Sequence, residues 1–369
     1  MAWAPLSGNQ MTSPENGCIL VNHPVHVASP APRMIWESVL TKDPNVLVDQ
    51  TPDWLDCICA AGSYKDASRL YEIPNRGTFI LPMVRSRFVP GFMASIHSLP
   101  PSWGTGGIIG NVSAQQIDVE IILKDLISLP GLRILIRPSP LANAAWKNVR
   151  GTGITVVSRR AHALDLRGGF DHIWNHKFDK KTRNLIRKAE SNGLTIECDK
   201  TGMLVPVFYQ LFEQSVSRWA EQQHEPQWLA RQRAHRRDPI AKFEMIAKRM
   251  KSACRIWVAW YQNEPAAAIL ILQGTNAHYI RGVMNMDIAG PTKANDLLQR
   301  YAIEDACQSG CGYYYMGDSG QSASIAHFKH RFGAEAIPYA EYHLERLPIT
   351  QVDAKLRGLV KRVIGFRDV

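Results

Sequence analysis

The chain has 369 residues, which exceeds the usual size of a single domain and favours two domains. Its composition, 45% hydrophobic and 21% charged, is typical of a globular protein and excludes a disordered or fibrous one. The formal net charge of +10 favours a polyanionic partner such as nucleic acid, coenzyme A or an anionic surface. No apolar run is long enough to span a bilayer, so we expect no transmembrane segment.

The N-terminal region lacks the features of a targeting sequence. Residues 1–32 are polar and interrupted by prolines, without the apolar core of a signal peptide, and we expect them to form a flexible tail. The seven cysteines are scattered, and the close pairs Cys57/Cys59 and Cys307/Cys311 lack zinc-ribbon spacing. We therefore expect reduced thiols, no metal site and a cytoplasmic protein.

The two halves of the chain predict the same order of elements: a hairpin, a strand or loop, a helix, a strand, a helix and a last strand. In the first half, after short helices at 33–40 and 52–60, these are expected at 68–84, 103–107, 114–128, 132–137, 138–146 and 155–166. In the second half, after helices at 171–192 and 203–250, they are expected at 255–272, 277–284, 292–309, 313–316, the segment around Lys329, and 336–344. This repetition predicts a tandem duplication of one α/β unit with a boundary near residue 168, although common elements also recur in order by coincidence.

Residues 313–320 predict a short aromatic strand followed by a polar turn. The strand is rich in β-forming tyrosines, it breaks at Gly317, and the helix that follows can end at Gly333. This arrangement places Asp318, Ser319 and Lys329 at the mouth of a sheet, where open α/β sheets hold their ligands.

The same residues carry a resemblance to a known family. Phe-Lys-x-x-Phe-Gly at 328–333, after a Gly-Asp-Ser turn, resembles the C-terminal signature of the FemAB/FemX-like transferases of the GNAT acyltransferase superfamily. Those proteins are tandem GNAT units whose first copy is largely a substrate platform. The resemblance therefore implies an α/β fold with mixed sheets in two tandem GNAT-like domains. The expected parts are an acceptor platform at 33–168, a catalytic domain at 169–346 and a basic C-terminal helix at 347–369.

Lys329 is the first candidate catalytic residue. A lysine on a helix that is entered from the end of a strand can reach a carbonyl oxygen on which charge develops during acyl transfer. The resemblance implies that Phe328 and Lys329 lie at the peptidyl-transfer centre near the tRNA acceptor end; without it, Lys329 reads as a surface lysine beside core phenylalanines. We expect Asp318 and Ser319 either to hold or deprotonate the attacking amine or simply to cap the helix.

A second set of residues is predicted to bind the substrate. Tyr279 and Arg281 alternate along a strand and share a face, and the guanidinium needs an anionic partner, which can be Asp318, Glu304 or a ligand. The resemblance adds an acceptor-binding helix and a glycine-bearing loop, for which an ordinary amphipathic helix and a flexible loop are the alternatives. The substrate-binding candidates are Tyr279, Arg281, Tyr315, Arg218, Trp219, Glu225 and Trp103.

Two basic segments are candidates for tRNA binding. Such clusters suit a phosphate backbone, although they are equally typical of solvated faces. Their candidate residues are Lys177, Lys180, Lys181, Arg187 and Lys188 in the first segment and Arg233, Arg236 and Arg237 in the second. A third basic segment, at 355–364, predicts an amphipathic helix that we expect to dock on the core, with RNA or a membrane surface as alternatives.

The donor is inferred from a motif that the chain lacks. A GNAT enzyme that uses CoA usually cradles the pyrophosphate with Arg/Gln-x-x-Gly-x-Gly/Ala, whereas residues 288–296 lack this motif and Pro291 removes one N–H. We therefore predict an amide-forming aminoacyltransferase that uses aminoacyl-tRNA and binds no cofactor. Its acceptor is expected to be the amine of a small or peptide-like molecule, in an antibiotic, secondary-metabolite or peptidoglycan-type pathway. An acyl-CoA-dependent N-acyltransferase is the alternative and a non-catalytic RNA-binding module a further one, and the oligomeric state stays open.

Overall fold

The computed structural model describes residues 25–320, 322–363 and 366. Most of the predicted tail at 1–32 lies outside the described residues. The part that is described does not behave as a tail, because β1 (His26–Ala28) pairs antiparallel with β3 (Arg69–Ile73). The hydrogen bond between the Ala31 amide and the buried Ser68 hydroxyl also holds this segment.

Two sheets organise the described chain. The smaller one has the order β1, β3, β4 (Gly77–Leu81) and β7 (Ile109–Gly110), and it contains the first predicted hairpin, β3–β4. The larger one has eleven strands and runs through both halves of the chain. Its order is β10 (Leu194–Asp199), β11 (Cys254–Tyr261), β12 (Glu264–Gln273), β13 (Ala277–Met284), β14 (Tyr313–Asp318), β9 (Ile154–Asp165), β15 (Glu335–Glu345), β8 (Arg133–Ile136), β6 (Ser95–Ser98), β5 (Val84–Ser86) and β2 (Tyr64–Asp66).

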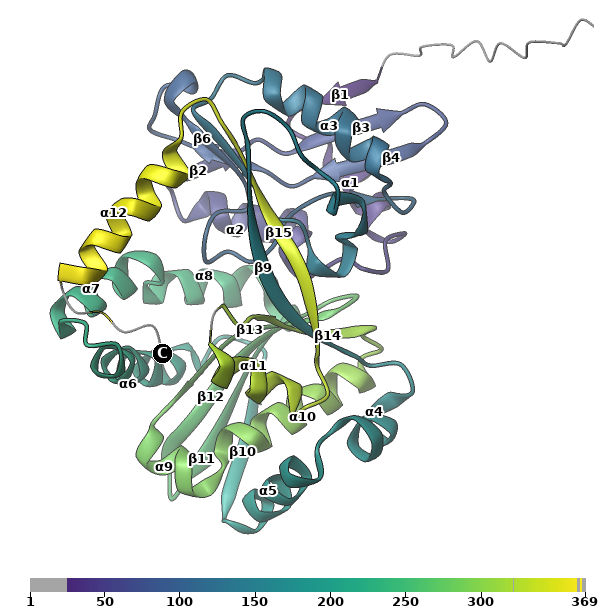
Figure 1. Cartoon of the computed structure of the whole chain (residues 1–369). Helices are drawn as coiled ribbons and strands as arrows, with labels where there is room; N and C mark the ends of the chain where they lie inside the picture. Colours follow the sequence, from purple (N-terminus) through teal and green to yellow (C-terminus); the bar gives the residue numbers. More distant parts are fainter. Residues whose placement is uncertain (1–24, 321, 364–365, 367–369) are drawn as a thin grey trace, which may run out of the picture.

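The strands β9 and β15 form a long antiparallel ribbon that connects the two halves (Figure 1). One end of β9 pairs with β14 of the second half, and the far end of β15 pairs with β8 of the first half. The predicted boundary near residue 168 falls at Gly168, directly after β9, where the backbone is left-handed with φ of 95°. The last strand of the second half therefore also completes the sheet of the first half.

Helices cover both halves of the large sheet. The region predicted as one helical stretch at 203–250 is three helices, because Pro226 and Pro239 each stand at the start of a new one. The region at 171–192 is likewise interrupted by a π-helical turn (Ile173–Lys177). The helices are α1 (Arg33–Leu40), α2 (Pro52–Ala60), α3 (Gln116–Ser128), α4 (Gly169–His172), α5 (Lys180–Ser191), α6 (Val205–Gln222), α7 (Gln227–Arg237), α8 (Ile240–Met250), α9 (Met286–Thr292), α10 (Ala294–Gln308), α11 (Ala323–His330) and α12 (Ile349–Val363).

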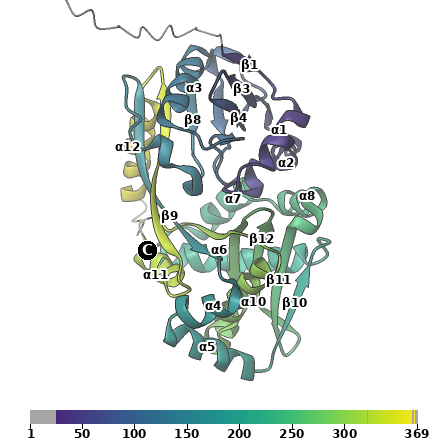
Figure 2. The same cartoon turned by 90° about the vertical axis from the view of Figure 1, so that its right-hand side faces the viewer.

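The two halves share a hydrophobic core. Trp36 and Trp54 from the first half belong to the same buried cluster as Phe208, Phe212 and Phe243 from the second half. Figure 2 shows the same seam, with α1 and α2 above α7 and α8. Because burial of large side chains is the main stabilising contribution in folding, this shared cluster holds the two halves in a fixed arrangement.

The C-terminal helix α12 does not dock on the core as predicted. Its apolar side chains Leu356, Leu359 and Val360 are 54–56% exposed. Its first turn is tied to the fold, since Thr350 bonds to Glu345 through both its amide and its hydroxyl. The prediction was wrong because periodicity identifies an amphipathic helix but not the surface that its apolar side faces.

Candidate active site

A cavity of about 540 Å³ lies where β13 and β14 separate. These parallel neighbours pair only at Ala277–Tyr314 and His278–Tyr315, and beyond that point β14 bulges and turns away. The turn needs Gly317, whose φ of 72° lies in the left-handed region that other residues avoid. The lining comes from both halves: Gly104, Thr105 and Arg137 from the first, and His278, Tyr279, Tyr315, Asp318, Phe328, Lys329 and Tyr339, among others, from the second.

Lys329 of α11 is buried in the wall of this cavity and is 3% exposed. Its Nζ donates hydrogen bonds to the carbonyl oxygens of Gly317, at 2.7 Å, and Asp318, at 2.6 Å. Burial lowers its pKa from 10.5 to about 8, and the Asp318 carboxylate partly opposes this change. An ammonium group has three N–H donors, so the two carbonyls leave one for a ligand in the cavity.

Asp318 stands at the rim, opposite a tyrosine of β15. The Tyr339 hydroxyl donates to Asp318 Oδ2 at 2.9 Å. The residue as a whole is exposed, but protein atoms crowd its carboxyl group and raise its pKa, against the effect of the Tyr339 hydrogen bond and of nearby cations. A carboxyl group placed in this way can hold a cationic or polar part of a substrate.

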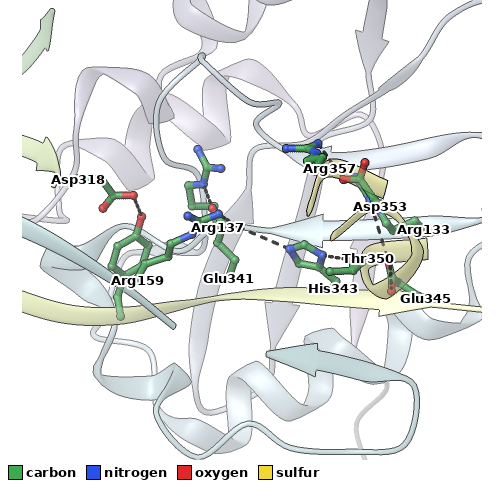
Figure 3. Close-up of polar contacts among 11 residues, drawn as sticks. Arg133, Arg137, Arg159, Asp318, Glu341, His343, Glu345, Thr350, Asp353 and Arg357 are labelled. Atoms are coloured by element: carbon green, nitrogen blue, oxygen red, sulfur yellow. Dashed lines mark hydrogen bonds and ion pairs between the residues drawn. The ribbon is translucent and has the colours of Figure 1, made fainter. Parts of the chain in front are cut away.

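Arg137 is held at the cavity wall by Glu341, a buried carboxylate on β15 (Figure 3). Glu341 is 2% exposed and also accepts a hydrogen bond from Arg159 at 3.0 Å. Burial disfavours ionisation of Glu341, but its contacts with His343 and with the two guanidinium groups prevail and lower its pKa from 4.5 to about 2. The ion cluster therefore keeps a fixed positive charge beside Asp318.

A carboxylate–histidine pair completes the cavity and joins the two halves of the chain. His278 Nδ1 lies 2.7 Å from Oδ1 of the fully buried Asp49, and Asp49 Oδ2 accepts from the Thr105 amide at 2.9 Å. A carboxylate can only accept, so Nδ1 carries a hydrogen and Nε2 has the lone pair of the neutral ring. The ring also packs against Tyr315, with 4.7 Å between the ring centroids. A histidine oriented in this way can act as a general base.

The structure brings part of the predicted catalytic set together. Phe328, Lys329 and Asp318 line the cavity, as do the substrate-binding candidates Tyr279 and Tyr315. Ser319 does not: it lies in a neighbouring depression, with Arg159 and Arg160.

The predicted helix cap at Asp318 or Ser319 is wrong. Ser322 caps α11, since its hydroxyl accepts from the Ile325 amide. The turn is therefore longer than the sequence suggested, and Asp318 is left free to face the cavity.

Arg281 is also placed differently from the prediction. Its anionic partner is Asp238, at 3.1 Å, rather than Asp318, Glu304 or a ligand, and it is not among the residues that line the cavity. A β-bulge between Leu270 and Ile271 of the paired strand changes the alternation, so that Tyr279 packs in one hydrophobic cluster and Arg281 lies over Phe212 of the other.

The remaining acceptor candidates do not line the cavity. Arg218 donates to the carbonyl oxygen of Met284, a residue that lines the cavity. Glu225 is buried and pairs with Arg233, and Trp219 packs on the shared core. Trp103 is buried beneath the Lys242 ammonium, at 4.3 Å, although the next two residues along the chain reach the cavity.

The two basic segments lie on different sides of the second half (Figure 1). On α5, Lys180, Lys181, Arg187 and Lys188 are exposed, whereas Lys177 just before it lies 3.7 Å from Glu335. On α7, two of the three arginines pair with acids, Arg233 with Glu225 and Arg237 with Asp238, and Arg236 is exposed. The α5 segment is therefore the less neutralised of the two.

Several residues of the site were missed from the sequence: Arg137, His278 and Tyr339, which line the cavity, and the buried Asp49, which contacts His278. Asp49 and His278 are 229 positions apart, so no local pattern connects them.

For the part of the chain that the structure describes, no group of His, Cys, Asp or Glu could hold a metal ion. Within the same residues, no helix is both long and apolar enough to cross a membrane.

Comparison with known proteins identifies the domain type of the second half and the fold of the chain. Residues 176–330 match the family model described as Acetyltransferase (GNAT) domain. The crystal structure of FemX is similar with a TM-score of 0.66 and 11% identity, over 89% of this chain and 99% of that chain. A conserved protein of unknown function from Bacteroides thetaiotaomicron VPI-5482 is similar with a TM-score of 0.53 and 8% identity, over 85% of this chain and 97% of that one.

A search of curated proteins gave no significant match. The match to the acetyltransferase domain supports the prediction of an N-acyltransferase enzyme. The prediction of mixed sheets in two tandem GNAT-like units is confirmed. The chain has the FemX-like GNAT fold.

Proposed function

We propose that the protein is an N-acyltransferase that moves an aminoacyl group from aminoacyl-tRNA to the amine of a small or peptide-like acceptor. The observation that carries this proposal is Lys329, a buried ammonium with a pKa of about 8 in the wall of a cavity that both halves of the chain line. A buried cationic donor is suited to stabilise an oxyanion, because its effect is strongest where water is excluded.

The reaction follows from the three polar groups of the cavity. The acceptor amine attacks the ester carbonyl carbon of the donor, a C–N bond forms, and the carbonyl oxygen becomes an oxyanion that accepts from Lys329. His278, held by Asp49, takes the proton that the amine loses, and Asp318 holds the acceptor. Collapse of the intermediate breaks the C–O bond, and the ribose oxygen of the tRNA leaves with that proton.

The choice of donor rests on the segment where a CoA-using enzyme would cradle pyrophosphate. Residues 286–292 form α9, and the Ala289 amide already donates to the Asn285 carbonyl, so these N–H groups do not face an open loop. Asp296 stands in the first turn of α10 and pairs with Arg331. A carboxylate at a helix N-terminus occupies the position that a phosphate would need, which disfavours CoA.

An acyl-CoA donor is the second candidate. The matched family is described as an acetyltransferase, and Lys293 lies at the start of α10. A binding comparison at one fixed, physiological salt concentration separates the two, because a basic protein binds any RNA when salt is low. We expect preference for charged over uncharged tRNA and no response to CoA thioesters. Tight CoA thioester binding combined with only salt-sensitive RNA binding would contradict the tRNA proposal.

Substitution of Lys329 tests catalysis itself. Lys329→Met should reduce turnover by about 10²- to 10³-fold and leave donor binding unchanged, because the oxyanion loses its donor. The matched control is Lys124→Met, which removes the same charge from an exposed position on α3, outside the candidate binding residues, and should leave turnover unchanged. A protein that binds RNA but shows no turnover with any charged tRNA or CoA thioester would instead be a non-catalytic binding module.

A further inference from the structure

Within the described residues, an apolar surface formed by a loop of the first half and by the C-terminal helix is left exposed. It consists of two parts, and we name them together the exposed edge: the loop between β5 and β6, and helix α12 with the residue that leads into it. Its members are Phe88, Val89, Phe92, Met93, Leu347, Val352, Leu356, Leu359 and Val360, with Phe88 81% and Phe92 68% exposed. A soluble monomer rarely exposes so many large apolar side chains in one region without a function.

The two parts of the exposed edge lie beside each other. The Leu132 amide donates to the Ala94 carbonyl at the end of the loop, and the Arg346 amide, just before α12, donates to the Leu132 carbonyl. Figure 1 shows α12 descending from the end of the β9–β15 ribbon, on the side of the molecule where β6 begins. Residue 132 therefore fixes the loop and the start of the helix at neighbouring positions.

Positive charge accompanies the apolar side chains. At 3.6 residues per turn, the apolar residues of α12 form one stripe, with Lys355 and Arg362 along one side and Arg357 and Lys361 along the other. Asp353 is the single acid between residues 346 and 362 of the sequence, and it pairs with Arg357 at 2.8 Å. The loop carries Arg87 and no acid. An apolar stripe between two cationic borders is the pattern of a helix that lies in a membrane interface.

We infer that the exposed edge binds the surface of an anionic lipid bilayer, with α12 parallel to the surface and the loop inserted through its phenylalanines. The basic borders would contact the lipid headgroups, while Leu356, Leu359 and Val360 enter the boundary of the acyl chains. Two copies of this chain would bring like charges together across the stripe. RNA would pair with the basic residues but leave the apolar stripe exposed to water. A second copy of the chain and RNA therefore explain the exposed edge less well than a membrane does.

Vesicle flotation of the full-length protein tests this inference at physiological salt. The probes are vesicles of pure phosphatidylcholine and vesicles of an equal mixture of phosphatidylcholine and phosphatidylglycerol. We expect binding to the mixed vesicles and at least about tenfold weaker binding to the neutral ones, because each basic residue near an anionic surface contributes to affinity. Equal binding to both kinds of vesicle, or to neither, would overturn the inference.

Variants distinguish vesicle binding through the exposed edge from nonspecific binding by other exposed apolar residues. Leu356→Asp combined with Leu359→Asp should weaken vesicle binding about tenfold or more, since burial of two leucines is lost. Phe88→Ser combined with Phe92→Ser tests the loop independently. The matched control, Met203→Asp combined with Ile127→Asp, changes two exposed apolar residues outside the edge and should bind like the parent. All four target residues of the edge are exposed, so these substitutions should leave the circular dichroism spectrum unchanged.

Two results would show that the exposed edge binds something other than a membrane. If the parent protein is a dimer that Leu356→Asp with Leu359→Asp converts to a monomer, and vesicles do not bind, the edge is an interface between copies. If Lys355→Glu with Arg362→Glu abolishes tRNA binding while vesicles do not bind, the edge is an RNA surface. Either result would refute the membrane inference.

Discussion

Removal of the Glu341 charge should destabilise the protein in a pH-dependent way. Glu341→Gln keeps the shape of the side chain but removes the carboxylate that holds Arg137 and Arg159 on either side of β15 (Figure 3). Because these partners lower the pKa of Glu341 from 4.5 to about 2 in the folded state, the folded chain gives up this proton more readily than the unfolded chain. The ionised carboxylate therefore contributes stability that is complete above pH 4.5 and is lost as the pH falls towards 2.

The size of the effect follows from the same pKa values. The difference between 4.5 and about 2 corresponds to about 3 kcal/mol at pH 7, because one pKa unit is worth about 1.4 kcal/mol. At pH 3 the unfolded chain is almost fully protonated at this position and the folded chain only partly. The contribution of Glu341 should then fall to about half of its value at pH 7.

Urea unfolding of the parent and the variant at pH 7 and pH 3 measures this difference. We expect Glu341→Gln to lower the free energy of unfolding by about 3 kcal/mol at pH 7 and by about half as much at pH 3. The control is Glu335→Gln on the same strand, whose carboxylate is exposed and lies 3.7 Å from Lys177, and whose loss should cost below about 1 kcal/mol at either pH. A loss for Glu341→Gln that is the same at both pH values, or no larger than that of the control, would refute the reasoning.

Three further predictions concern the cavity. Asp49→Asn should lower turnover by about tenfold or more and leave donor binding unchanged, because His278 loses the carboxylate that orients its ring. If the variant turns over as fast as the parent protein, the Asp49–His278 pair takes no part in catalysis. Turnover of the parent should fall above about pH 8, where Lys329 loses its proton because burial has lowered its pKa to about 8; a rate that stays constant up to pH 10 would contradict its role as ammonium donor. Gly104→Ala should lower the melting temperature, because Gly104 has φ of 84° and a new Cβ would collide with the Asp49 carboxylate; an unchanged melting temperature would show that the loop can shift.

Local sequence was sufficient for elements whose structure depends on nearby residues. The hairpin β11–β12, the strand β14 and the helix α11 follow from β-forming runs, a glycine turn and a short amphipathic segment, and they are where the sequence predicts them. Lys329 also lies where the strand, turn and helix order predicted it, whereas Phe328 was selected by the resemblance and Ser319, predicted by the same order, lies outside the cavity. The residues that the first half of the chain contributes to the cavity did not follow from such rules.

Contacts between distant parts of the chain decided the rest. Asp49 meets His278 only because the two halves share one core, and Asp238 takes Arg281 away from the cavity because a bulge turns that side chain to the other face of the sheet. The amphipathic pattern of α12 was visible in the sequence, but its exposure was not. Periodicity specifies which side of an element is apolar, whereas the partner of that side depends on how the whole chain packs, and a charged side chain pairs with whichever opposite charge the packing brings within reach.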